Sequence, residues 1–414
     1  MCTDTQAGAG HGGVRAWVPY AGFTVFGAFW GVWGASVPAI RDQAGLTDGR
    51  LGTALLFIAA GALPAMPLAG RALDRWGQRV TAITLMSLGI AGVVVAVTAR
   101  GLPALSVGLA VLGASSGAAD VTINAAAGAV ERAGGRPVIT RAHGFFSLAV
   151  VAASLVTGLL NAAGLPLVVP YVLVMLAAGA VSAAIAAGGR TRTGPRRHDH
   201  ARAPAAPGRP RLRAHLPLLL VAGGLGALGF AVENAHQSWS AVYLADTVHA
   251  GPALVGAGPA VFALAVSLTR FAISAVKTPR AWIVLTAGAV ISAAGTSLLA
   301  LTASLPLALL GLALAAAGTA VLFPTVLGLA TANVPAAARG AATSVVSTSA
   351  YLGYLGGPVY VGHWAQATGL PGAMLAVAAL AAALALLAWP ALRAVVPSPA
   401  RHGTSEAGGR VLSS

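Results

Sequence analysis

The stretch Gly189-Arg190-Thr-Arg-Thr-Gly-Pro-Arg-Arg-His198-Asp-His200 lies near the middle of a chain of 414 residues that is otherwise poor in charge. It begins a polar segment, residues 189–215, that is rich in arginine, alanine and proline. Such a segment cannot build a hydrophobic core, so we expect a flexible linker there. Long apolar runs precede and follow it, and the linker therefore divides the chain into two apolar parts.

The composition of those parts decides the class of protein. Hydrophobic residues make up 57% of the chain and charged residues only 8%, whereas a soluble domain carries about 25% charged residues. This excludes a soluble enzyme, a nucleic-acid-binding domain and a disordered chain. The single cysteine, Cys2, also excludes a disulfide framework and a cysteine metal cluster. The composition therefore indicates a protein that crosses a membrane many times.

The apolar runs are long enough to be membrane-spanning helices, which need about 20 mostly apolar residues each. They are continuous and too long for the alternating strands of a barrel. We predict an all-α membrane protein with twelve transmembrane helices, six on each side of the linker. The expected spans are residues 17–40, 51–70, 80–99, 102–128, 143–164, 166–188, 216–245, 252–276, 281–303, 306–331, 341–363 and 370–395. Residues 17–188 are expected to form one six-helix bundle and residues 216–395 the other.

Short turns are predicted between paired spans on the side opposite the linker. These are Gly101-Leu-Pro103, Gly164-Leu-Pro166, Gly251-Pro252, Ser304-Leu-Pro306 and Gly369-Leu-Pro371. Glycine and proline are the residues that most often end one helix and start the next. The turns therefore predict helical hairpins.

Basic residues indicate which side faces the cytoplasm. Of 25 lysines and arginines, only Arg41, Arg50 and Arg100 fall in the expected outer loops, and Arg270 falls within a span. Because loops rich in arginine stay on the cytoplasmic side, we expect an inner-membrane protein with both tails, residues 1–16 and 396–414, in the cytoplasm. The net charge of +15 is then explained by nearby anionic lipid rather than by nucleic acid.

A charged turn lies between the second and third spans. It reads Gly70-Arg-Ala-Leu-Asp74-Arg75-Trp-Gly77-Gln-Arg79 and resembles the signature loop of the major facilitator superfamily of membrane transporters. The resemblance implies two six-helix halves around a central cavity. Gly70 is expected to allow close packing at a helix end and Gly77 to allow a tight turn. The acid and the two following arginines are expected to latch the cytoplasmic side in one state; a solvated basic turn is the alternative.

Further segments resemble one bacterial branch of that family, the rhizopine-uptake-like permeases and their mostly uncharacterised inner-membrane relatives. They are Trp33–Ile40, Asp120–Asn124, Arg136–His143, Trp239–Leu244 and Tyr351–Pro358. The resemblance implies a secondary transporter but does not indicate its substrate. The branch often has an acid just before the tryptophan of span seven, where this chain has Ser238. No coupling role is therefore carried over to that position.

Two acids lie inside the predicted spans, Asp120 and Glu233. An ionised carboxylate at bilayer depth costs several kcal/mol unless it is paired, hydrated or protonated, so both are candidates for proton coupling. Polar residues on the same helix faces are candidates for a substrate cavity, namely Asn124, Asn234, His236 and Gln237. Hydrogen bonding between helices is the structural alternative for all of them.

Aromatic pairs three residues apart are further candidates for the cavity. They are Trp30 with Trp33 and Tyr351 with Tyr354, which could stack on a sugar-like or amphipathic solute. Packing against lipid is the alternative for each. His143, at the expected cytoplasmic start of span five, is a candidate for gating or proton relay because histidine titrates near neutral pH. A histidine that faces lipid headgroups is the alternative there.

These features predict a secondary transporter of a small organic solute that works by alternating access and is coupled to protons. Uptake of a sugar-like compound is favoured; the alternatives are proton-driven export of a drug-like or amphipathic compound and, from another class, a non-transporting membrane sensor or scaffold. The chain has no G-x-x-x-x-G-K-(S/T) phosphate loop, which excludes direct use of a nucleotide. We expect a monomer in the lipid bilayer, with the solute and protons as partners and without enzyme activity, cofactor or metal.

Overall fold

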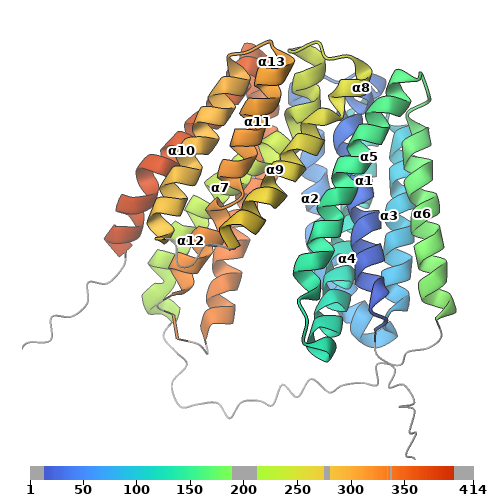
Figure 1. Cartoon of the computed structure of the whole chain (residues 1–414), viewed down its shortest axis with the longest axis horizontal. Coiled ribbons are helices and arrows are strands. Elements are labelled where there is room, and N and C mark those ends of the chain that lie inside the picture. The colour runs from blue at the N-terminus through green and yellow to red at the C-terminus, as the bar shows by residue number, and fades with distance from the viewer. Residues whose placement is uncertain (1–13, 189–211, 275–279, 333, 336–337, 396–414) are drawn as a thin grey trace, which may run out of the picture.

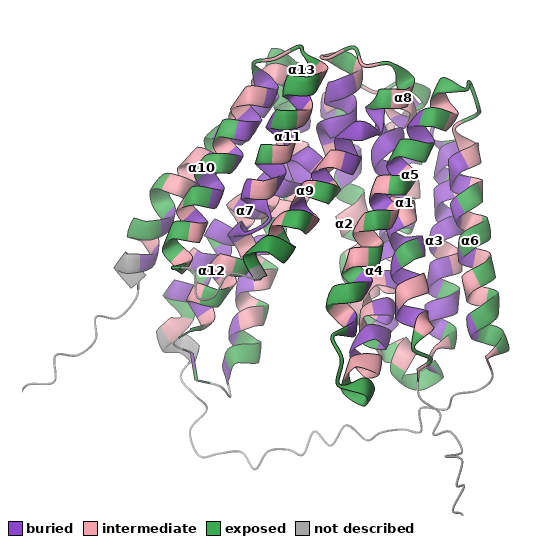
Figure 2. Ribbon diagram, in the orientation of Figure 1, coloured by how far each residue is buried: buried purple, intermediate pink, exposed green. Residues whose placement is uncertain are grey.

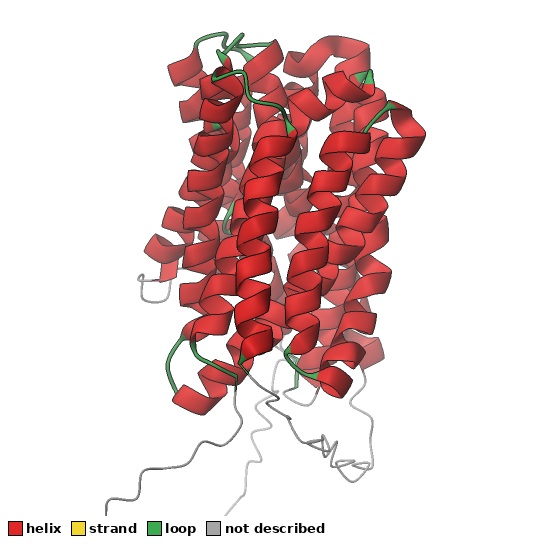
Figure 3. Ribbon diagram, turned by 90° about the vertical axis from the view of Figure 1, so that its right-hand side faces the viewer, coloured by secondary structure: helices red, strands yellow, loops and turns green. Residues whose placement is uncertain are grey.

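A computed structural model describes residues 14–188, 212–274, 280–332, 334–335 and 338–395. Within these residues every regular element is a helix (Figure 3). The helices are α1 (Trp17–Ala44), α2 (Asp48–Trp76), α3 (Arg79–Thr98), α4 (Gly101–Gly134), α5 (Val138–Ala162), α6 (Val168–Ala187), α7 (Leu212–Asp246), α8 (Pro252–Val255), α9 (Ala257–Ser274), α10 (Ala281–Ala300), α11 (Leu305–Thr319), α12 (Leu322–Thr331) and α13 (Arg339–Val395). The expected all-α architecture is confirmed.

Several membrane spans do not coincide with single helices. α8 and α9 together form one span, Pro252–Ile273, and α11 and α12 form another, Leu305–Thr331. α13 contains two spans, because Gly369 has φ 77° and ψ 168° and breaks the helix between them. The described residues hold eleven segments long and apolar enough to cross a membrane, and the break in α13 divides one of them to give twelve. The predicted twelve-helix fold in two six-helix halves is confirmed.

Many helices extend beyond the apolar runs from which they were predicted. α2 reaches Trp76, α4 reaches Gly134 and α5 begins at Val138 rather than at His143. The added turns carry polar and charged side chains, which a helix can present to headgroups and water outside the hydrocarbon. α7 begins at Leu212, so the last residues of the expected linker are helical. The rest of the linker and most of both tails lie outside the described residues.

The turns between paired spans have the backbone that their glycines and prolines predicted. Gly101, Gly164 and Gly369 have φ values of 69°, 72° and 77°, a region that disfavours other residues. Gly251 and Ser304 precede helices with proline in the first turn, where its missing N–H costs nothing. The predicted helical hairpins are therefore present.

The helices form two groups, α1–α6 and α7–α13, which stand side by side (Figure 1). The groups meet at the end that carries the hairpin turns, which we name the hairpin face. They diverge toward the end where α6 stops and α7 starts, which we name the linker face. Buried residues concentrate within the groups and at their junction, and exposed residues cover the outer surface (Figure 2).

Glycine allows paired helices to approach closely. An added Cβ would meet a backbone carbonyl across the helix pair at Gly27 (Phe146 of α5), Gly113 (Ile58 of α2) and Gly353 (Ala227 of α7). In a bilayer, lipid is as apolar as the side chains, so close packing of small residues supplies much of the attraction between helices. These close contacts hold pairs of helices together, two pairs in the first half and one in the second.

We predict that Gly353→Ala destabilises the protein and that Gly356→Ala does not. Both glycines lie in α13, but a Cβ at Gly353 would overlap the backbone of Ala227, whereas one at Gly356 meets nothing within 4 Å. Overpacking of this kind costs about 1–3 kcal/mol. Thermal unfolding in detergent should show a lower midpoint for Gly353→Ala only. Equal midpoints for the two variants would contradict close α7–α13 packing.

Candidate functional site

A cavity of about 720 Å³ lies between the two halves. Its walls come from α1, α2, α4 and α5 on one side and from α7, α9 and α13 on the other. The candidate residues that line it are Trp30, Trp33, Asp120, His143, Glu233, Asn234, Gln237, Tyr351 and Tyr354. The structure thus brings together candidate residues from three predicted spans of the first half and two of the second.

Glu233 is buried in the cavity wall and has two polar partners. Its Oε1 accepts a hydrogen bond of 3.2 Å from Nε2 of Gln237, one turn later on α7. Nη2 of Arg270 lies 3.5 Å from the same oxygen. Arg270 comes from α9, and its side chain is 51% exposed. The guanidinium supplies a countercharge for the ionised carboxylate, which otherwise would stand alone at membrane depth.

The sequence did not identify Arg270 as the partner of Glu233. The sequence places it within a span but does not indicate what it contacts. A signal was available, because Arg270 is the one lysine or arginine in the predicted spans apart from Arg393, which lies at the very end of the last span. A cation at that depth needs an acid nearby.

Asn234, the neighbour of Glu233, connects α7 to α13. Its Nδ2 donates to the carbonyl of Tyr354, and its Oδ1 accepts from Oγ of Ser238 at 3.1 Å. Both amide atoms of Asn234 are therefore hydrogen-bonded, Nδ2 to α13 and Oδ1 within α7. The residue acts as an interhelical link, as the structural alternative predicted.

Asp120 supplies a carboxylate from the first half. Its Oδ1 accepts a hydrogen bond of 3.0 Å from Nδ2 of Asn124, which also donates to the Asp120 carbonyl at 2.9 Å. Asn124 lies outside the cavity lining and orients the acid from behind. No ion pair of Asp120 is found in the part of the chain that the structure describes. The two acids therefore differ in their electrostatic surroundings.

Aromatic rings cover much of the remaining wall. Tyr351 and Tyr354 lie with ring centroids 6.1 Å apart, and Phe230 of α7 contacts them at 5.8 and 6.2 Å. On the first half, Trp30 packs edge to face against Phe29 at 5.8 Å. The structure places all four candidate rings, those of Trp30, Trp33, Tyr351 and Tyr354, in the cavity lining.

His236 does not line the cavity, and this corrects its expected place there. It is fully buried, and its Nδ1 lies 2.7 Å from the carbonyl of Val232 while its Nε2 lies 3.1 Å from Oγ1 of Thr296 on α10. At 100° per residue, a side chain three positions after Glu233 is turned by about 60° from it. That rotation directs His236 toward α10.

His143 lies where the cavity approaches the linker face. It is exposed, its ring is 4.7 Å from that of Phe23, and it interacts electrostatically with Arg270 of the other half. Ile139 and Thr140, in the first turn of α5, also line the cavity. The cavity therefore extends toward the end where the two halves diverge.

An ion cluster joins the halves at the hairpin face. Nη1 of Arg41, near the end of α1, lies 3.0 Å from Oδ1 of Asp48, and Nη2 lies 3.0 Å from Oδ1 of Asp42. The same guanidinium binds both carboxylate oxygens of Asp246, at the end of α7. Asp246 is the one member from the second half. Arg41 was expected only as a basic residue of an outer loop, and the sequence alone did not indicate the cluster.

Backbone contacts close the hairpin face beside this cluster. Gly52 of α2 packs on the backbone of α13 at Pro358, and Gly158 of α5 packs on the backbone at Ala253 of α8. A Cβ at either glycine would overlap a carbonyl oxygen of the other half. The cavity is thus shut at the hairpin face by both charge and close packing.

The charged turn of residues 70–79 ends α2 and begins α3. Gly77 has φ 65° and caps α2, which confirms the expected tight turn. A Cβ at Gly70 would meet nothing within 4 Å, so its expected role in close packing is wrong in this conformation. Asp74 is exposed, and no ion pair joins it to Arg75 or Arg79 among the described residues. The ion network expected for this turn is therefore not formed among the described residues in this conformation.

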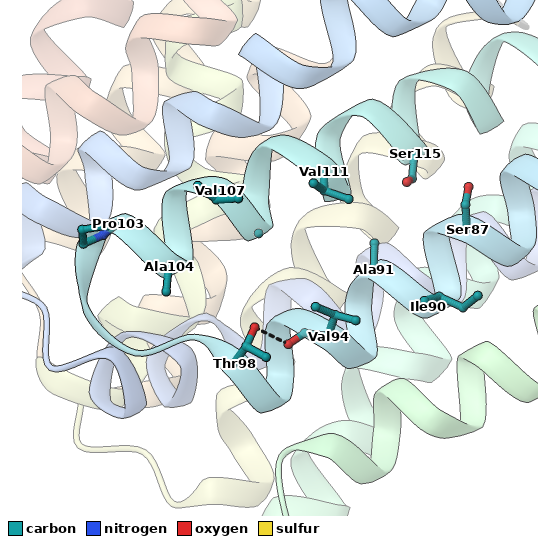
Figure 4. A pocket seen from close by; sticks show the side chains of 11 residues that line it. Ser87, Ile90, Ala91, Val94, Thr98, Pro103, Ala104, Val107, Val111 and Ser115 are labelled. Atoms are coloured by element: carbon teal, nitrogen blue, oxygen red, sulfur yellow. Dashed lines mark hydrogen bonds between the residues drawn. The ribbon is translucent and has the colours of Figure 1, made fainter.

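A second hollow, of about 610 Å³, lies between α3 and α4 (Figure 4). Its walls are mostly apolar, and Val107 and Val111 are 67% and 54% exposed on the outer surface. The hydroxyl of Thr98 is bound to the carbonyl of Val94 in its own helix. Both walls belong to one half, so this groove suits lipid chains better than a transported solute.

Comparisons with known proteins agree with this architecture. The family model of the Major Facilitator Superfamily matches residues 232–414. An uncharacterised MFS-type transporter of Yersinia pestis is 33% identical over 139 residues, which cover 33% of this chain and 36% of that protein. The membrane protein MosC of Rhizobium meliloti is 30% identical over 139 residues, 34% of each chain. The second half of the chain is thus similar to the major facilitator superfamily. The matched part spans only about a third of each relative's length.

A solved structure extends the likeness to both halves of the fold. The D-xylose–proton symporter superimposes with a TM-score of 0.70 at 15% identity, over 90% of this chain and 96% of that one. At this identity the likeness concerns the fold alone. The family is one of membrane transporters rather than enzymes, as the signature loop had implied.

We predict that Asp246→Asn weakens closure of the hairpin face. The substitution removes the only carboxylate by which the Arg41 cluster reaches the second half among the described residues. An exposed ion pair contributes about 0.2–1 kcal/mol. The probe is a cysteine introduced at cavity residue Ala263 in a Cys2→Ser background. It should react about two to five times faster with an impermeant thiol reagent added from the hairpin side.

Asp42→Asn is the matched control for that measurement. It removes an equal charge from the same guanidinium, but Asp42 and Arg41 both lie in α1. Its labelling rate should stay near that of the parent. Equal acceleration in both variants would mean that charge alone, and not the bridge between halves, sets the rate.

Proposed function

We propose that the chain is a proton-coupled secondary transporter that moves a small, hydroxyl-bearing organic solute through the inner membrane by alternating access. The observation that carries the proposal is the central cavity, in which each half contributes one carboxylate, Asp120 and Glu233. A solute site between two six-helix halves that rock about it is the arrangement of such transporters. The shared fold of the D-xylose–proton symporter supports coupling to protons.

The cavity wall supports a polar, sugar-like solute. Small-molecule sites are mostly apolar with a few polar groups that fix orientation. Here Gln237 and Ser238 of α7 present amide and hydroxyl groups beside the flat rings of Trp30 and Tyr351. Such a wall can hydrogen-bond hydroxyls and pack against the face of a ring. We therefore favour a sugar-like compound as the substrate class and uptake as the direction of transport.

The charge pattern supports a cytoplasmic linker face. Arginines at the helix ends of the linker face include Arg71, Arg75, Arg132 and Arg141, whereas those near the hairpin face are Arg41, Arg50 and Arg100. Positive residues are retained on the cytoplasmic side. In this orientation the cavity faces the cytoplasm and both tails are cytoplasmic. The structure is then the inward-open state of the transporter. Its two bundles span residues 17–188 and 216–395.

In the proposed cycle Glu233 exchanges a proton with the cavity. When it is ionised, Arg270 is its countercharge at 3.5 Å; when a proton neutralises it, the pair loses its electrostatic attraction. Asp120, which has only an amide partner, is the second acid that can be neutralised. His143, at the cytoplasmic end of the cavity, is positioned to pass protons between water and these acids.

We predict that Glu233→Gln abolishes proton-driven accumulation but leaves exchange of solute across the membrane. Glutamine keeps the shape and one acceptor oxygen of the side chain but cannot gain or lose a proton. Solutes are first selected from pentoses, hexoses, sugar alcohols and nucleosides by thermal shift of the purified protein. Uptake into proteoliposomes is then measured with and without an inward proton gradient.

Gln237→Leu serves as the control for that assay. It changes the polarity of the same wall without removing a titratable group, so it should weaken binding while the response to the gradient persists. Accumulation by Glu233→Gln equal to that of the parent would contradict the proton-binding role of Glu233. Loss of the response in both variants would assign the effect to solute binding.

We predict that Asp74→Asn shifts the protein further toward the inward-open state. In this structure Asp74 has no ionic partner among the described residues, and its proposed bonds form only when the cytoplasmic ends come together. Their loss should cost the outward-open state about 0.5–1 kcal/mol. Labelling of a cysteine at Thr140, on the cavity's cytoplasmic side, should rise about two- to fivefold, whereas Asp74→Glu should behave as the parent. An unchanged rate in Asp74→Asn would contradict the latch.

A further inference from the structure

Pro324 interrupts the hydrogen bonding of the span formed by α11 and α12. α11 ends at Thr319 and α12 begins at Leu322. Proline has no backbone N–H, so Pro324 cannot donate to the carbonyl of Ala320, four residues earlier. An unpaired carbonyl at this depth is costly because the hydrocarbon offers no water. The Ala320 carbonyl therefore needs a donor from elsewhere in the protein.

Arg270 supplies that donor. Its Nε donates to the Ala320 carbonyl at 3.4 Å, while its Nη2 lies 3.5 Å from the Glu233 carboxylate. The guanidinium has five N–H groups in a planar fork, so it can serve both acceptors at once. One side chain on α9 thus connects the acid of α7 to the break between α11 and α12.

The break is in turn connected to the cavity wall. Phe323, the residue before Pro324, stacks on Phe230 with ring centroids 4.3 Å apart and an interplanar angle of 29°. Phe230 lines the cavity and contacts both Tyr351 and Tyr354. A movement at the break would therefore reach the aromatic surface on which a solute packs.

Other titratable groups near Glu233 lie on different helices from the break. Tyr354 of α13 interacts electrostatically with Glu233, and also with Asp120 of α4 and with Tyr351. His143 of α5 acts on Arg270 from across the cavity. His236, on the same helix as Glu233, faces Thr296. α11 and α12 contain no ionisable side chain, so Arg270 is the charged group that can carry a change at Glu233 to them.

We propose that Arg270 is a positioning residue of the transport cycle that transmits protonation of Glu233 to the break between α11 and α12. The inference rests on the proposed function, in which Glu233 binds the transported proton. While Glu233 is ionised, the guanidinium is held between carboxylate and carbonyl. When Glu233 is neutral, the charge-assisted contact weakens and the Ala320 carbonyl becomes the dominant partner. The guanidinium then moves toward α12 and shifts Phe323 against Phe230.

A second proline of the same half provides a matched control. Pro358 of α13 leaves the carbonyl of Tyr354 without its helical donor, and Nδ2 of Asn234 donates to that carbonyl. The arrangement is the same, but the donor is a neutral amide that does not titrate. Replacing either proline by alanine restores a backbone N–H to the carbonyl, whereas only Pro324→Ala removes an acceptor from Arg270.

The test measures conformation and does not require the solute. In the full-length chain with Cys2→Ser, spin labels at Ala133 and Ala341, exposed on α4 and α13 at the linker face, report the distance between the halves in nanodiscs. Between about pH 5 and pH 9, the wild-type distance distribution should shift as Glu233 titrates. Pro324→Ala and Arg270→Lys should reduce the size of this shift about threefold or more, and Pro358→Ala should retain it.

Glu233→Gln separates this inference from the proposed function. It should abolish the shift. A shift retained in Glu233→Gln, or absent from the wild type, would overturn the proton-binding role of Glu233 and the inference with it. Loss in Glu233→Gln together with a full shift in Pro324→Ala and Arg270→Lys would overturn the Arg270 connection alone. An equal reduction in Pro358→Ala would also overturn it, because straightening any cavity helix would then suffice.

Discussion

Every backbone polar group at the depth of the hydrocarbon must find its partner inside the protein, and this constraint organises the interior of the chain. Most backbone groups are paired within helices, but a proline inside a helix leaves one carbonyl without its helical donor. Arg270 donates a hydrogen bond to the Ala320 carbonyl that Pro324 leaves unpaired. Asn234 does the same for the Tyr354 carbonyl that Pro358 leaves unpaired. The same side chains surround Glu233, so the groups that complete the helices also form the cavity. The hydrogen bonds of Arg270 and Asn234 thus contribute both to the stability of the helices and to the shape of the cavity.

Much of the fold could be predicted from the sequence because it depends on local patterns. The spans follow from apolar length, and turns such as Gly164 and Gly369 follow from glycine beside proline. The Asp120–Asn124 contact was also predictable, since residues four apart on a helix are neighbours. Helix ends were less predictable, because a span continues past the hydrocarbon wherever its charged side chains reach water.

The contacts between helices could not be predicted in the same way. The Glu233–Arg270 pair depends on how α7 and α9 are rotated about their axes, which spacing along either helix does not specify. His236 shows the same limit. Its side chain is turned by about 60° from that of Glu233 on α7, so it lies against α10 instead of in the cavity. The Arg41 cluster required the ends of α1 and α7 to meet, a contact over 205 positions of sequence. The sequence shows one arginine close to two of the acids, but it does not show that the side chains of all four residues meet.

The closure of the hairpin face combines contacts that respond differently to the surrounding medium. The Arg41 cluster sets one positive side chain among three negative ones, at the edge of the membrane where water has access. Dissolved salt weakens attractions between exposed charges, with a screening length of about 10 Å at about 0.1 M, but it leaves the glycine crossings beside them unaffected. Ionic strength on that side of the membrane therefore weakens only part of the seal, so high salt at the hairpin face eases its opening and low salt keeps it closed.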